Sequence, residues 1–241
     1  MLRIIKFFKD ALLAFPVTLL FQPLARYMAF IFYYNKLIRW IHRNKKTVDF
    51  HDFYSPKRDY SKRLNLYRHV SGGHSLDAAP ITYLEFGVAS GSSFKWWLEH
   101  NGNASSRFFG FDTFEGLPED FGSYVKGTLA FNMPDIKDSR SLFVKGLFQD
   151  TLPGFIQNHA EVLREPTRKL IHLDADLYSA TIFALSQLYP YLNKGDIILF
   201  DEFNVAMHEF KAYDEFVNNF YVKLRLLGGV NNFYQVAFVV E

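Results

Sequence analysis

From Ile81 to the C-terminus, short runs rich in β-branched and aromatic residues alternate with stretches that have a helical pattern. Strands joined through helices run parallel, because each helical crossover returns the chain to the end of the sheet where it started. The alternation therefore predicts an α/β fold built on a doubly wound, mostly parallel sheet. The expected strands are 81–86, 107–112, 141–145, 169–174 and 195–201, and the expected helices are 92–100, 151–164 and 179–192.

The C-terminal end follows a different pattern. After Asp201 the sequence predicts a helix over about 208–221 and two more strands over 222–228 and 232–240. The link Gly228-Gly229-Val230-Asn231 is too short for a helical crossover, so these two strands are expected to form an antiparallel hairpin. A parallel sheet closed by such a hairpin resembles the seven-stranded, Rossmann-like class I methyltransferase fold.

Composition narrows the chemistry. The 241 residues suit one domain with an appendage, and 49% apolar residues are enough for a packed core. The chain has no cysteine, which excludes disulfides, cysteine-ligated zinc, iron–sulfur clusters and thiol nucleophiles. We expect a cytoplasmic protein, with association to a membrane as the alternative.

Charge divides the chain into a basic head and an acidic body. Residues 1–47 have a net charge of +8, and because the whole chain carries +2, the remainder carries −6. An acidic body argues against a nucleic-acid partner. The basic residues of the head, against the single acid Asp10, are Arg3, Lys6, Lys9, Arg26, Lys36, Arg39, Arg43, Lys45 and Lys46.

The head, residues 1–47, is expected to be a basic, hydrophobic helical segment. Its uncharged run over 11–25 is short for a membrane span, which needs about 20 residues, and Pro16 and Pro23 interrupt it. Two interpretations remain: helices that pack on the domain, cover the site or form a homodimer contact, or peripheral binding to an anionic membrane. Residues 48–79 are interpreted as a connector, and 80–241 as the catalytic domain, beginning at Pro80.

The first strand of the domain ends in a turn of small residues, Glu85-Phe-Gly87-Val-Ala89-Ser-Gly91-Ser-Ser93. Small residues allow the backbone to pass close beneath a ligand. The spacing lacks the G-x-G-x-x-G fingerprint of nicotinamide dehydrogenases and resembles motif I of methyltransferases that use S-adenosylmethionine. That resemblance implies that Glu85 supports the methionine ammonium group and that the Ser93 hydroxyl meets the methionine carboxylate.

The next two strand ends extend this pattern. Asp112, followed by Thr113, stands at the tip of the second strand, where a carboxylate can accept both ribose hydroxyls. After the third strand, the segment with Gln149 and Asp150 resembles the one that meets the adenine edge. Each motif alone is compatible with ordinary turn chemistry, but their order on three consecutive strand ends predicts S-adenosylmethionine as the cofactor.

Acidic residues gather at the ends of the fourth and fifth strands. Asp174 and Asp176 follow the fourth strand, and Asp201 and Glu202 follow the fifth. Neither motif contains Lys or Arg, so the carboxylates would repel one another unless a cation joined them. Oxygen ligands favour Mg²⁺, which would hold a substrate hydroxyl and lower its pKa. The alternative is that these acids cap helices.

The segments LIHLDADLYSAT, GDIILFDEF and SLFVKGLFQDTLPGF resemble the macrocin O-methyltransferase family over residues 81–241, and catechol O-methyltransferase more distantly. The resemblance implies methylation of a sugar hydroxyl on a small, glycosylated natural-product-like acceptor. It implies metal binding by Asp174, Asp201 and Glu202, with Asp176 as the general base and Asp174 as a second catalytic residue beside the cofactor. The family's usual acidic pair is Asp-Asp, so Glu202 departs from it and leaves a metal-free site as the competing hypothesis.

Two histidines and one alternative function remain open. His172 is interpreted as a packed core residue, since it lies within a strand. His208 either borders the substrate pocket or caps the surface. The alternative to an enzyme is a non-catalytic protein that keeps the cofactor fold and docks at a membrane or partner.

Overall fold

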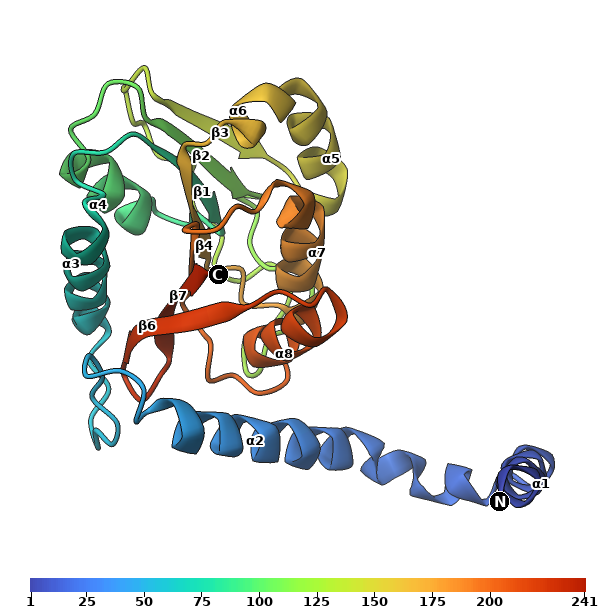
Figure 1. Cartoon of the computed structure of the whole chain (residues 1–241). Coiled ribbons are helices and arrows are strands. Elements are labelled where there is room, and N and C mark those ends of the chain that lie inside the picture. The colour runs from blue at the N-terminus through green and yellow to red at the C-terminus, as the bar shows by residue number, and fades with distance from the viewer.

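A seven-stranded sheet forms the centre of the molecule in a computed structural model that describes all 241 residues (Figure 1). The strand order is β3-β2-β1-β4-β5-β7-β6; β1 to β5 are parallel, and β7 is antiparallel to both β5 and β6. The strands are β1 (Ile81–Phe86), β2 (Arg107–Asp112), β3 (Ser141–Lys145), β4 (Arg168–Leu173), β5 (Ile197–Phe200), β6 (Leu224–Val230) and β7 (Gln235–Val240). The predicted doubly wound sheet with a C-terminal antiparallel hairpin is therefore confirmed.

Two details differ from the prediction. The helix expected over 151–164 begins at Phe148 and consists of α5 (Phe148–Asn158) and α6 (Ala160–Arg164). The hairpin turn spans residues 231–234 instead of 228–231, because Gly228, Gly229 and Val230 pair with β7 within β6. Asn231, Asn232 and Phe233 make the turn instead, each with a positive φ.

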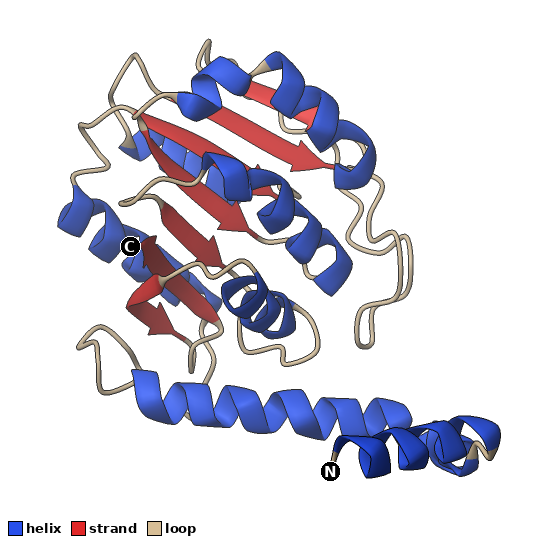
Figure 2. Ribbon diagram, turned by 45° about the vertical axis from the view of Figure 1, so that its right-hand side comes forward, coloured by secondary structure: helices blue, strands red, loops and turns tan.

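Helices cover both faces of the sheet (Figure 2). The larger apolar core lies between the sheet and α5, α7 and α8, and includes Phe86, Phe111 and Phe200. The second core lies on the other face, where Tyr83 and Phe108 pack beneath α3 and α4. Of these helices, α3 spans Arg63–His74, α4 spans Ser92–His100, α7 spans Tyr178–Leu188 and α8 spans Glu209–Asn219.

The segment predicted to be a connector, residues 48–79, is built into this fold. Its helix α3 buries Leu66, Tyr67 and Val70 in the second core, and its backbone also pairs with β6, since the Gly229 amide donates to the Phe50 carbonyl over 3.0 Å. The composition of polar residues and glycines suggested a loop, but the apolar positions 66, 67 and 70 share one helical face.

The head is helical, as expected, and only its last part packs on the domain. Its elements are α1 (Leu2–Ala14), the 3₁₀ helix η1 (Val17–Leu24) and α2 (Ala25–Asn44). Leu37 and Ile41 of α2 are buried, and Lys36 forms an ion pair of 2.6 Å with Asp214 of α8. The first part projects away from the domain (Figure 1), and no helix of the chain is long and apolar enough to cross a bilayer.

Candidate functional site

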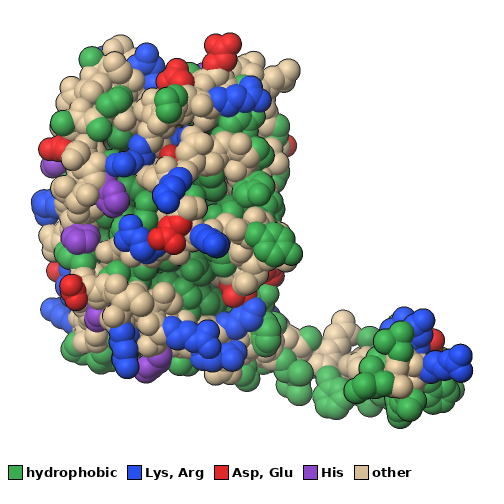
Figure 3. Space-filling model, viewed as in Figure 1, with side chains coloured by type: hydrophobic (Ala, Val, Ile, Leu, Met, Phe, Trp, Pro, Cys, Tyr) green, Lys and Arg blue, Asp and Glu red, His purple; other side chains and the backbone are tan.

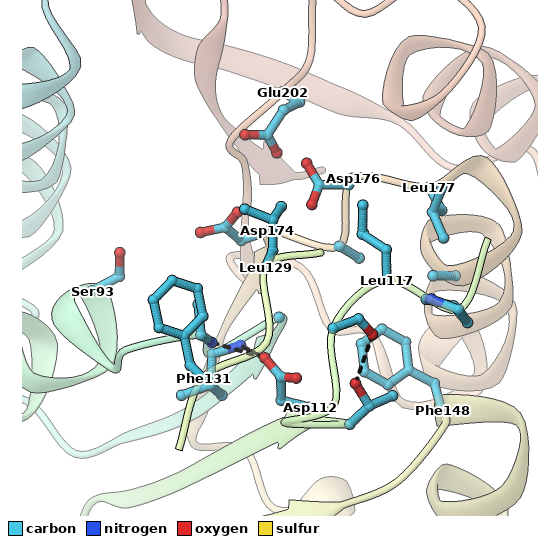
Figure 4. A pocket seen from close by; sticks show the side chains of 18 of the residues that line it. Ser93, Asp112, Leu117, Leu129, Phe131, Phe148, Asp174, Asp176, Leu177 and Glu202 are labelled. Carbon is cyan, nitrogen blue, oxygen red and sulfur yellow. Dashed lines mark hydrogen bonds between the residues drawn. The ribbon is translucent and has the colours of Figure 1, made fainter. Parts of the chain in front are cut away.

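A cavity of about 420 Å³ lies at the carboxyl ends of the parallel strands. Residues that follow β1, β2, β3, β4 and β5 all contribute to its wall, which is the place where open α/β sheets bind ligands. Figure 4 shows the side chains of Ser93, Asp112, Phe148, Asp174 and Glu202 around this space. Nine of the predicted site residues line it: Gly87, Ala89, Ser93, Asp112, Thr113, Gln149, Asp174, Asp176 and Glu202.

Gly87 sets the close approach of β1 to β4. Its φ is +94°, and a Cβ at this position would lie 1.7 Å from the carbonyl oxygen of Asp174, so only glycine fits. Gly91, with a φ of +79°, begins α4, and a Cβ there would lie 2.7 Å from the side chain of Pro134. Gly91 shapes the turn without lining the cavity.

Asp112 ties the end of β2 to the turn after β1. Its Oδ2 accepts hydrogen bonds from the amides of Val88 (2.8 Å) and Ala89 (2.7 Å), and its Oδ1 accepts from the amide of Phe114 (2.7 Å). A carboxylate has about four acceptor sites, so this arrangement leaves one for a ligand. The neighbouring Thr113 hydroxyl donates to the carbonyl of Gly116 over 3.0 Å.

Glu85 lies behind the cavity wall and does not line it. It is 1% exposed, and its carboxyl group accepts a hydrogen bond of 2.7 Å from the Tyr83 hydroxyl. Burial raises the pKa of Glu85 to about 8, so the group is protonated at neutral pH. Asp150 is also outside the cavity, exposed in the first turn of α5, where an acid favours the helix dipole.

The predicted acidic cluster is formed. Asp174, Asp176 and Glu202 line one end of the cavity (Figure 4), and Asp201 is buried just behind them. Burial, followed by the neighbouring carboxylates, raises the pKa of Asp174 and of Glu202 well above the usual range. Burial and the charges of Asp201 and Asp112 raise the pKa of Asp176 to about 6.

Two side chains from the segment 48–79 join this cluster. The Tyr60 hydroxyl donates to Asp201 Oδ2, and the Arg63 guanidinium lies 4.0 Å from the same oxygen. Arg63 also donates to the Ser92 hydroxyl over 2.9 Å, at the start of α4. The two acidic motifs contain no Lys or Arg, and the basic neighbour comes instead from α3, where one arginine faces several carboxylates.

His172 is a core histidine, as predicted, and it also reaches the back of the acidic cluster. Its Nδ1 lies 2.9 Å from the Tyr83 hydroxyl, and its Nε2 lies 4.0 Å from Asp201 Oδ1. Burial and the charge of Arg63 lower the pKa of His172 to about 3, so the ring is neutral. Ligand atoms of His172, Asp174 and Asp201 lie within 4.8 Å of one another, so this potential metal-ligand group contains His172 where the sequence predicted Glu202.

Glu209, which the sequence did not single out, holds the loop after β5. Its side chain is fully buried at the start of α8 and accepts a hydrogen bond of 2.9 Å from the Glu202 amide. His208, next to it, does not line the cavity; its ring meets Phe121 edge-on at 4.9 Å, and burial lowers its pKa.

The sequence model of the family described as Macrocin-O-methyltransferase (TylF) matches residues 123–227. A curated relative is 28% identical over 181 residues: the 8-demethyl-8-(2,3-dimethoxy-alpha-L-rhamnosyl)-tetracenomycin-C 4'-O-methyltransferase of Streptomyces olivaceus. The match covers 63% of this chain and 66% of that relative, just under two thirds of its length.

Solved structures share the fold. CalS11, a calicheamicin methyltransferase, superposes with a TM-score of 0.56 at 22% identity, covering 86% of this chain and 91% of that chain. The O-methyltransferase NovP superposes with a TM-score of 0.52 at 20% identity, covering 74% and 79% of the two chains. The chain thus has the class I methyltransferase fold, and the predicted resemblance to the macrocin O-methyltransferase family is confirmed.

Proposed function

We propose that this relative of the macrocin O-methyltransferases transfers a methyl group from S-adenosylmethionine to a hydroxyl group of a glycosylated small molecule. One observation supports this most strongly: the β2 carboxylate Asp112 and the acidic cluster of β4 and β5 line the same cavity. A cofactor whose ribose is held by Asp112 would have room to direct its methyl group toward the acidic cluster.

The cavity offers groups suited to each part of the cofactor. Asp112 retains an acceptor site for a ribose hydroxyl, and Gln149 lies where a side-chain amide suits the adenine edge. At the other end, Ser93, Arg63 and the first amides of α4 suit a carboxylate, because a helix N-terminus and a guanidinium both favour anions. Arg63 is thus a candidate for the methionine carboxylate, whereas Glu85, which the sequence assigned to the ammonium group, is buried outside the cavity lining.

The acidic cluster suits a divalent cation. Asp201 Oδ1 and Glu202 Oε2 are buried without a hydrogen-bond partner, which is costly for carboxylates unless a cation joins them. We assign Asp174, Asp201 and Glu202 as the ligands, since an all-oxygen set suits Mg²⁺ better than the set with His172. When bound, such an ion would lower the pKa of an acceptor hydroxyl.

Asp176 is assigned as the general base. Its side chain opens into the cavity, and its pKa of about 6 leaves the carboxylate ionised at neutral pH. The proton of the acceptor hydroxyl would pass to this carboxylate as the oxygen gains the methyl group. Asp176 adopts a φ of +57°, a strained conformation for a non-glycine residue and one that recurs at functional sites.

Calorimetry with S-adenosylmethionine and a methyl-transfer screen against nucleotide-linked and lipid-linked sugars test the proposal. We expect cofactor binding with or without metal, transfer in the presence of Mg²⁺, and loss of transfer in EDTA. Full activity in EDTA with metal-free protein would place the chemistry on Asp176 alone. Cofactor binding without transfer to any acceptor would favour the non-catalytic alternative, and absence of cofactor binding would refute the proposal.

A further inference from the structure

The N-terminal arm, residues 1–32, is an exposed apolar surface with no partner in the chain. Only Ala11 and Ala29 within it are even partly buried, and none of its residues belongs to either core. Figure 3 shows hydrophobic side chains along the arm where it stands away from the domain. The arm holds 19 of the 32 large apolar side chains that the chain exposes. Monomeric proteins rarely expose apolar patches of this extent unless the patch binds something.

Helix α1 has all its charged residues on one side, which also carries Leu2 and Leu13. At 100° per residue, Ile4, Phe8 and Leu12 fall on one side of the helix, and each is between 48% and 62% exposed. Arg3, Lys6 and Lys9 fall on the opposite side, together with the only acid, Asp10. A basic polar face opposite a Phe and Leu face is typical of helices that lie in a membrane interface.

The segment after α1 contains no charged residue. Pro16 and the eight residues of η1 carry Leu19, Leu20 and Phe21 exposed to solvent. Arg26 lies in the first turn of α2. The exposed apolar residues that follow it include Phe30 and Ile31. This apolar segment is flanked by the basic residues of α1 and by Arg26. Its side chains are suited to contact lipid acyl chains, while the flanking basic residues contact anionic headgroups.

A second copy of the chain is less suited to cover this surface. The arm has four basic residues and one acid, so two arms placed side by side would repel each other. The domain is acidic, but its exposed large apolar residues are fewer than those of the arm, so it offers less apolar surface to cover. We propose that the arm docks on a bilayer that contains anionic phospholipid.

Docking would bring the site toward the bilayer. In Figure 2 the arrowheads of the parallel strands point toward the side of the molecule to which α2 extends from the domain. Residues of the loops after these strands form the rim of the cavity. An arm held in the headgroup region would keep this rim close to the membrane surface.

Sedimentation of the full chain with vesicles tests this proposal. We compare vesicles of phosphatidylcholine alone with vesicles that also contain phosphatidylglycerol, without cofactor or acceptor, so the result does not depend on the proposed activity. Binding is expected to the mixed vesicles and to weaken with salt. The triple variant R3Q/K6Q/K9Q should lose about a hundredfold in affinity, since each basic residue near the surface contributes about fivefold.

The controls separate charge on the arm from charge in general. K95Q/K137Q/K194Q removes the same charge from exposed positions of the domain and should change vesicle affinity less than threefold, roughly. I4S/F8S should weaken binding at every salt concentration while circular dichroism and the melting temperature stay unchanged. The proposal is overturned if the native chain ignores mixed vesicles, if the domain control loses as much affinity as R3Q/K6Q/K9Q, or if I4S/F8S binds normally. It is equally overturned if light scattering shows a stable dimer that I4S/F8S dissolves, with no vesicle binding.

Discussion

Asp112 illustrates how one side chain serves both the fold and the site. Its carboxylate holds three backbone amides, those of Val88, Ala89 and Phe114, and still lines the cavity. Charge-assisted hydrogen bonds to backbone amides are about twice as strong as neutral ones, so they fix the turn after β1 before any ligand arrives. A ligand that bonds to Asp112 therefore meets a group already held in place.

Replacing Asp112 by alanine should weaken S-adenosylmethionine binding about tenfold to a hundredfold, which corresponds to roughly 1.5–3 kcal/mol. Both the bond to the ribose and the shape of the turn would be lost. Titration calorimetry measures the affinity, with Glu115→Gln as a matched control, because Glu115 is an exposed acid three residues along the same loop. Native affinity in Asp112→Ala would remove this residue from the cofactor site.

Glu85 makes stability depend on pH in the absence of ligand. Its pKa is about 8 in the folded chain, against 4.5 for an ordinary glutamate, because burial disfavours the charged form. A folded pKa above the unfolded value means that the contribution to stability is complete below about pH 4.5 and is lost as the pH rises through 8. Between these limits the loss approaches about 1.4 kcal/mol per pH unit.

The variant Glu85→Gln should therefore gain stability relative to the native chain as the pH rises from 5 to about 8. Urea unfolding at several pH values gives the difference in free energy of unfolding. Glu99→Gln is the control, since the side chain of Glu99 is 58% exposed and should give a difference that does not vary with pH. A constant difference for Glu85→Gln would show that Glu85 is ionised in the folded chain.

At the scale of elements, α3 connects a segment of weak sequence pattern to the site. The helix buries Leu66 and Val70 against the sheet, and η2 (Tyr60–Lys62) and the first turn of α3 deliver Tyr60 and Arg63 to Asp201. The packing of α3 therefore controls the position of both side chains at the acidic cluster.

Leu66→Ala should lower the free energy of unfolding by about 2–5 kcal/mol, because it leaves a cavity in the second core. Chemical denaturation measures this. The control Arg68→Ala alters an exposed position on the same helix and should change stability by less than about 0.5 kcal/mol. Equal effects in the two variants would mean that α3 is a surface connector after all.

The elements and the site were predictable to different degrees. Alternation of β-rich and helical runs is a local signal, so the sheet, its hairpin and the strand-end acids Asp112, Asp174 and Asp201 followed from the sequence. Tyr60 was not predictable, because it meets a partner 141 residues away and no local motif marks it. The orientation of Glu85 was missed for a related reason: the turn motif fixes its place on β1 but says nothing of the Tyr83 hydroxyl beside it.

At the scale of the whole molecule, the head combines two different structures. The arm makes no buried contact, whereas the last part of α2 contributes to the larger core and packs against the loop that follows β5. Trp40 donates from Nε1 to the Tyr213 hydroxyl over 3.1 Å and packs 4.7 Å from the ring of Phe203, which directly follows Glu202. The uniform basic character of residues 1–47 hid this division, because charge pattern does not report which residues are buried.

Two deletions should separate these parts. Removal of residues 1–24 deletes α1 and η1, which have no buried residue, and should change the free energy of unfolding by less than about 0.5 kcal/mol. Removal of residues 1–47 also deletes Leu37, Trp40 and Ile41 from the larger core, and each large apolar side chain lost from a core costs about 2–5 kcal/mol.

The longer deletion should therefore unfold the domain or leave it several kcal/mol less stable, with Phe203 and the loop that carries Glu202 uncovered. Denaturant unfolding followed by circular dichroism measures both chains, and S-adenosylmethionine calorimetry reports whether the site survives. Because the shorter deletion keeps all of α2, it serves as the control for loss of the head as such. Equal stability of the two deletions would show that the boundary of the domain lies after residue 47 and that α2 only rests against it.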